Sequence, residues 1–139
     1  MSKPVKSLFV LILTGLLAAC VTAPPPEPVF TYNEVVIINR LRVPVQDVAI
    51  EAIESGRVFS CGNIAPRGIC SNKFPARPYY GDPIQVSWRV AGGGYLGRQL
   101  KLQLPKDFKP ELPLRGVLVI GAGGALSSYL EQEAPGPHF

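Results

Sequence analysis

The segment Ile84-Gln85-Val86-Ser87-Trp88-Arg89-Val90 decides the fold, because its side chains alternate between apolar and polar. Successive side chains of a β-strand point to opposite faces of a sheet, so this alternation predicts a strand with one buried face and one solvated face. The segment has no helical period. Trp88 belongs to the apolar series, and we therefore expect it to fill the core rather than to serve as a ligand platform.

The next stretch along the chain repeats the pattern. Residues 99–104 alternate Gln, Lys and Gln with Leu100, Leu102 and Leu104, which predicts a second strand. The run Gly92-Gly93-Gly94 lies between the two segments. The two strands are therefore expected to form a hairpin with a loose, glycine-rich connection.

Apolar runs before and after this hairpin predict further short strands. Residues 34–43 are rich in β-branched side chains, residues 47–54 place Val48, Ile50 and Ala52 on one side, and residues 118–120 are continuously apolar, as in an interior strand. Eight prolines separate or border these runs: Pro44, Pro66, Pro75, Pro78, Pro83, Pro105, Pro110 and Pro113. Residues 125–131 fit either a terminal strand or one or two helical turns.

Six or seven short strands at a spacing of roughly ten residues favour an all-β fold over a βαβ fold. The chain of 139 residues is predicted to hold a single domain. We expect a small antiparallel β-sandwich, immunoglobulin-like or transthyretin-like, with a small barrel as the alternative.

The first twenty residues have a different character from the rest. Lys3 and Lys6 precede an apolar run from Leu8 to Leu17, and Ala18-Ala19-Cys20 follows it. The stretch resembles a bacterial lipoprotein signal, which implies that residues 1–19 are removed and that the thiol of Cys20 is acylated. The apolar run is too short for a membrane-spanning helix, which needs about 20 apolar residues.

The resemblance also implies a layout and a location. Residues 20–31 are rich in proline and are interpreted as an extended tether, residues 32–133 as the sandwich, and residues 134–139 as a frayed tail. Val21 stands where aspartate would signal retention at the inner membrane, so the resemblance implies an outer membrane protein facing the periplasm. Its expected partners are the membrane, through acylated Cys20, and another envelope protein or an envelope polymer.

Cys61 and Cys70 remain once Cys20 is assigned to the lipid. In an oxidising compartment they are predicted to form a disulfide that closes a short loop. Eight residues separate them, whereas redox pairs usually have two, and a metal site would need partners beyond the single His138. The spacing is also too short for the disulfide that joins the two sheets of antibody domains.

Positive charge gathers in the second half of the mature chain. Residues 57–115 carry ten basic and three acidic side chains, whereas residues 27–54 carry two and five. A basic and aromatic loop is predicted next to the disulfide, with candidate binding residues Arg67, Lys73, Phe74, Arg77, Tyr79 and Tyr80. The alternative is a solvated loop whose aromatic side chains pack back on the sandwich.

Groups typical of catalysis are scarce. His138 lies next to the C-terminus, where nothing would orient it as a base or a metal ligand. The run Gly116–Ala125 resembles a dinucleotide-binding turn, but Leu126 stands where the third glycine belongs and too few residues follow for a βαβ unit. No catalytic residue, cofactor, metal, nucleotide or nucleic acid is predicted.

These features together favour a non-enzymatic, lipid-anchored envelope protein that acts as an interaction or assembly module, for example an accessory of a secretion, pilus or envelope-maintenance complex. One alternative is a module that binds glycan or lipid A through the loop at residues 67–80. Another is a small inhibitor of a hydrolase such as lysozyme. Lysozymes are generally cationic, and the net positive charge of this chain disfavours that alternative.

Overall fold

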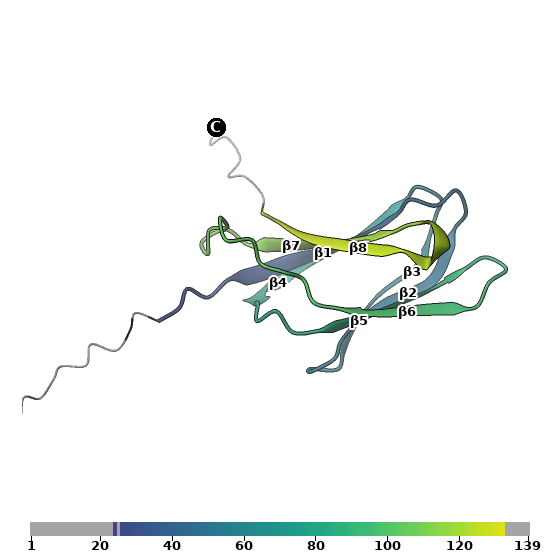
Figure 1. Cartoon of the computed structure of the whole chain (residues 1–139). Helices are drawn as coiled ribbons and strands as arrows, with labels where there is room; N and C mark the ends of the chain where they lie inside the picture. Colours follow the sequence, from purple (N-terminus) through teal and green to yellow (C-terminus); the bar gives the residue numbers. More distant parts are fainter. Residues whose placement is uncertain (1–23, 25, 133–139) are drawn as a thin grey trace, which may run out of the picture.

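Eight strands form two stacked four-stranded sheets in the computed structural model, which describes residues 24 and 26–132 (Figure 1). The strand order is β4-β1-β7-β8 in one sheet and β3-β2-β5-β6 in the other. The strands are β1 (Thr31–Asn39), β2 (Val45–Ala52), β3 (Arg57–Ile64), β4 (Ile69–Pro78), β5 (Ile84–Val90), β6 (Tyr95–Leu100), β7 (Leu114–Ile120) and β8 (Leu126–Gln132). The predicted all-β sandwich is confirmed.

One strand pair departs from the antiparallel pattern. β1 and β7 run parallel, from Tyr32 opposite Leu114 to Asn39 opposite Ile120, whereas every other pair is antiparallel. Residues 101–113 carry the chain from β6 across to the other sheet, so that β7 enters at the same end as β1 (Figure 1). Parallel neighbours cannot be joined by a tight turn, and here residues 40–113, with β2 to β6, separate β1 from β7.

The core lies between the two sheets and contains the residues that alternation predicted. Trp88 is completely buried, and Val86, Val48 and Ile50 are buried beside it. β7 lies between β1 and β8, which confirms that the continuously apolar run is interior. Packing from both sheets therefore stabilises the central strands.

The structure corrects two sequence predictions in detail and decides one that the sequence left open. The second strand of the hairpin, predicted at residues 99–104, is instead β6, which ends at Leu100. The strand ends there because Leu100 pairs with Ile84, the first residue of β5, and later residues have no partner on β5. Residues 69–78, predicted as a loop, form strand β4. Residues 126–132 form β8 and pair with β7, which settles the choice between strand and helix.

The disulfide between Cys61 and Cys70 is present, but it does more than close a loop. Cys61 belongs to β3 in one sheet and Cys70 to β4 in the other, so the bond joins the edges of the two sheets. The amide of Asn72 donates to both sulfur atoms, at 3.6 Å to Cys61 and 3.9 Å to Cys70.

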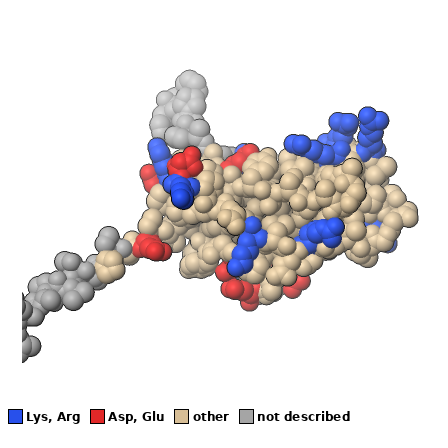
Figure 2. Space-filling model, in the orientation of Figure 1, with Lys and Arg blue, Asp and Glu red and all other residues tan. Residues whose placement is uncertain are grey.

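A buried asparagine organises the end of the sandwich opposite the N-terminal segment. The side-chain amide of Asn39 donates to the carbonyls of Val43 (2.9 Å), Ile64 (3.3 Å) and Ala65 (3.1 Å), and its oxygen accepts from the backbone of Leu41 (2.9 Å). These bonds tie the β1–β2 turn to the β3–β4 turn. Three exposed arginines sit on these turns, where Figure 2 shows cationic side chains gathering: Arg40, Arg42 and Arg67.

The proposed signal peptide and Cys20 lie outside the described residues, as does the predicted tail at residues 134–139. Strand β1 begins at Thr31, next to the predicted start of the domain. Within the described ranges, no helix has the length and hydropathy to cross a bilayer.

Candidate ligand-binding cavity

A cavity of about 600 Å³ opens between the two sheets, a size within the range of small-molecule sites. Its mouth is formed by the β2–β3 turn and the β4–β5 loop, at the end of the sandwich from which the N-terminal segment leaves (Figure 1). The apolar side chains that line it come from both sheets and from the crossover segment: Val35, Ile50, Phe59, Ile84, Leu102, Leu118 and Leu130.

The inner wall of the cavity consists of core residues. Ile50 and Leu118, which form its deep wall, expose only 3% and 0% of their surface. Gly116 of β7 adds room beside them, because a Cβ atom at this position would lie 3.4 Å from the Leu102 side chain. The inner wall is therefore apolar and suits a hydrocarbon group that enters from the mouth.

A chain of aromatic rings closes one side of the cavity. Phe59 of β3 stacks on Phe74 of β4 with ring centroids 5.2 Å apart. Phe74 meets Tyr32 edge to face at 5.2 Å, and Tyr32 meets Tyr79 in the same way at 6.0 Å. Such pairs stabilise beyond their buried area. The rings span the gap between the sheets near the mouth, so this part of the predicted aromatic set packs back on the sandwich.

Tyr79 holds the crossover segment against the β4–β5 loop. Its hydroxyl donates to the carbonyl of Leu102, and its backbone N–H donates to Phe30 (2.8 Å). Burial, with a further contribution from the charge of Asp82, raises the pKa of Tyr79 to about 12. The hydroxyl therefore stays protonated and remains a donor at physiological pH.

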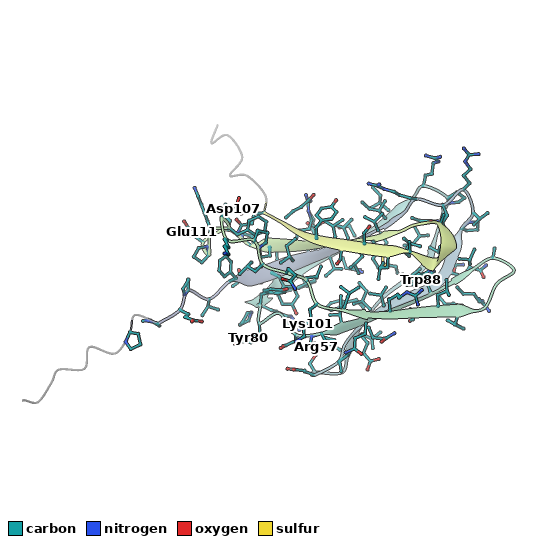
Figure 3. All side chains as sticks on the ribbon, viewed as in Figure 1. Arg57, Tyr80, Trp88, Lys101, Asp107 and Glu111 are labelled. Atoms are coloured by element: carbon teal, nitrogen blue, oxygen red, sulfur yellow. A yellow bond between two sulfur atoms is a disulfide. The ribbon has the colours of Figure 1, made fainter. Side chains whose placement is uncertain are left out.

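Four charged side chains line the mouth: Glu54, Arg57, Arg77 and Asp82. Tyr80, which Figure 3 labels together with Arg57, also lines the mouth and is 76% exposed. The Nη1 atom of Arg77 is buried and has no hydrogen-bond acceptor within the described part of the chain. The Arg77 guanidinium lies over the Phe74 ring at 5.8 Å.

An irregularity in β4 turns Arg77 toward the cavity. Glu34 pairs with Lys73 and Tyr32 with Arg77, so three residues of β4 (74–76) lie opposite the single residue Asn33 of β1. In a regular strand, Phe74 and Arg77 would point to opposite faces. The bulge, which includes Pro75, brings both residues to the half-buried face of β4, where Arg77 reaches the cavity.

The six candidate binding residues do not form one loop. β4 is ten residues long, and its length separates Arg67 from Arg77 by about 30 Å. Lys73 is exposed and lies beside Glu34 and Arg115, away from the cavity. Arg77, Tyr79 and Tyr80 line the mouth, and Phe74 packs behind them against Tyr32 and Phe59.

The remaining sequence motifs take structural positions. The run Gly116–Ala125 covers most of β7 and a short 3-10 turn, η1 (Ala122–Gly124), and the chain then returns as antiparallel β8 rather than continuing as a βαβ unit. Between residues 26 and 132, no three side chains of the metal-ligating types come together. His138 lies outside the described residues.

Comparison with known proteins places this chain in no family. No family model matches it, and no curated protein matches its sequence. A solution NMR structure of a protein from Eubacterium rectale is similar over 84% of this chain and 99% of that one, with a TM-score of 0.44 and 11% identity.

Proposed function

We propose that the protein is a non-enzymatic, lipid-anchored binding module of the bacterial envelope, which takes an elongated apolar ligand between its two sheets. The observation that carries the proposal is the apolar cavity of about 600 Å³, open at one end of the sandwich and lined there by polar groups. A concave apolar site with a few polar groups at its opening is typical of small-molecule binding.

The resemblance of residues 1–20 to a bacterial lipoprotein signal supports a location beside lipid. With Cys20 acylated, the twelve residues to Tyr32 would span up to roughly 35 Å as an extended proline-rich chain. The cavity opens at the end of the sandwich where this segment joins β1 (Figure 1). A tethered domain in this orientation would hold the mouth of the cavity near the membrane, where acyl chains are the most abundant elongated apolar groups.

A probe-binding experiment with a matched pair of variants tests this proposal. Ala52 lines the cavity, whereas Val58, on the neighbouring strand, is 60% exposed. Ala52→Trp would fill the cavity, and Val58→Trp adds the same ring on the surface. N-phenyl-1-naphthylamine, an apolar fluorophore, should bind the wild-type chain and the Val58→Trp variant, and bind Ala52→Trp at least tenfold more weakly. Equal binding by all three proteins would contradict the proposal.

The end of the sandwich that carries Arg40, Arg42 and Arg67 supports a second candidate function, which is docking on an anionic envelope polymer. Arg40, Arg42 and Arg67 lie on two turns tied together by Asn39, and those turns contain no carboxylate. Clustered exposed cations attract polyanions in a salt-dependent way. The triple arginine-to-glutamine variant should lose salt-sensitive cosedimentation with purified peptidoglycan sacculi. Cosedimentation equal to that of the wild type would exclude this surface.

A further inference from the structure

We propose that Arg77 binds the anionic head group of a single-chain amphiphile whose acyl tail fills the cavity, which makes a long-chain fatty acid the ligand. This inference rests on the proposed function and specifies its ligand class. The recognition chemistry is a guanidinium hydrogen bond to a ligand carboxylate, with the tail directed toward Leu118.

The first step of the argument is the unmet donor of Arg77. A guanidinium keeps its charge at every physiological pH and has five N–H donors. The buried Nη1 atom has no acceptor among the described residues, although a buried charged donor without a partner is destabilising. Glu54 and Asp82 line the same mouth, but within the described part of the chain neither forms an ion pair with Arg77.

The second step is the fixed position of the guanidinium. Arg77 pairs with Tyr32 across the β1–β4 ladder, and its guanidinium lies over the ring of Phe74. Both rings belong to the aromatic side of the cavity. The side chain is thus held at the mouth before any ligand arrives, which lowers the entropy lost on binding.

The third step is the polarity of the cavity along its depth. Charged groups occupy the mouth, whereas the side chains farther along the strands are hydrocarbon: Val35, Ile50, Leu118 and Leu130. A sugar or a peptide in the deep part would lose hydrogen bonds to water without regaining them. A ligand with an anionic head and a plain hydrocarbon tail matches both regions.

The fourth step favours one chain over two. The aromatic side and the crossover segment meet at the mouth, where the Tyr79 hydroxyl donates to the Leu102 carbonyl and closes this part of the cavity wall. The cavity volume of about 600 Å³ limits the ligand further. A free fatty acid fits these limits better than a phospholipid with two tails.

Three ligands that share the same tail separate the contribution of the head group to binding from that of the tail. We expect dodecanoate to displace the fluorophore about tenfold more effectively than dodecanol, and dodecylamine to be the weakest, because hydrogen bonds to charged groups are the strong ones. Longer acids should bind about fourfold more tightly per added methylene until the cavity is full.

Variants of Arg77 and of an arginine outside the cavity test the residue itself. Arg77→Gln should abolish the preference for dodecanoate over dodecanol, and Arg77→Lys should restore only part of it because lysine lacks the planar fork. Arg98→Gln, at an exposed residue that does not line the cavity, is the control and should keep the preference. Thermal unfolding of each variant verifies that it is folded before binding is compared.

The outcomes distinguish this inference from the proposed function. Equal binding of dodecanoate and dodecanol by the wild-type chain would overturn the role of Arg77 and leave the cavity as an apolar site. Stronger displacement by vesicles of an anionic phospholipid than by dodecanoate would overturn the assignment to a single-chain acid. Failure of every amphiphile to displace the fluorophore would remove the proposed function together with the inference.

Discussion

Removal of the disulfide is the perturbation whose effect follows most directly from the fold. The bond joins β3 of one sheet to β4 of the other with a sequence separation of 9. β3 and β4 lie in different sheets and are not paired as neighbours. Replacing both residues, Cys61→Ala with Cys70→Ala, removes this covalent link and leaves the strands themselves unchanged.

The size of the effect can be worked from the length of the closed loop. For a ring of this size, the chain-entropy model gives a loss of about 2.7 kcal/mol in the free energy of unfolding. For a domain of this length, such a loss lowers the melting temperature by roughly 10–20 °C. The replaced sulfur atoms are only partly buried, so lost packing adds little.

Urea unfolding of the described domain followed by tryptophan fluorescence measures this loss, because the fully buried Trp88 reports on the core. The double variant and the reduced wild-type chain should unfold at the same lower midpoint, with the urea dependence of the oxidised protein little changed. A loss below about 1 kcal/mol would refute the view that the bond restrains the unfolded chain and ties the two sheets.

Two further predictions concern single side chains. The pKa of Tyr79 in the folded protein is about 12, above its ordinary value, so the folded state holds this proton more tightly than the unfolded state. The free energy of unfolding should therefore fall as the pH rises from about 10 toward 12. Urea titrations of Tyr79→Phe should show no such fall. Asn39→Ala should lower the free energy of unfolding by about 2–3 kcal/mol, because carbonyls of two turns lose their donor. A change under about 0.5 kcal/mol in the same assay would show that the two turns keep their structure without the Asn39 side chain.

The central strands could be predicted from the sequence because each has a clear burial pattern. Residues 84–90 alternate, and residues 118–120 are continuously apolar, in agreement with one wet face on β5 and full enclosure of β7. The edge strand β4 carries Lys73, Pro75 and Arg77 and has no comparable pattern, because its side chains are at least partly exposed along its length. Its strand character comes from pairing with β1, a contact between distant segments.

The candidate site was only partly visible in the sequence. Arg77, Tyr79 and Tyr80 were candidates because basic and aromatic residues cluster there, whereas Arg67 was grouped with them by sequence distance alone. The cavity itself depends on contacts between segments far apart in the chain, such as Val35, Leu102 and Leu118. The inward turn of Arg77 depends on the bulge opposite Asn33, which alternation does not predict.

The central claim is that an acyl chain lies between the two sheets, and isotope-filtered NMR with ¹³C-labelled dodecanoate tests it most directly. The account predicts nuclear Overhauser effects from the labelled tail to the methyl groups of Ile50, Leu118 and Leu130, which line the cavity. Effects confined to Val36 and Ile38, which alternate with the core residue Ile37 on β1, or no effects at all, would contradict it.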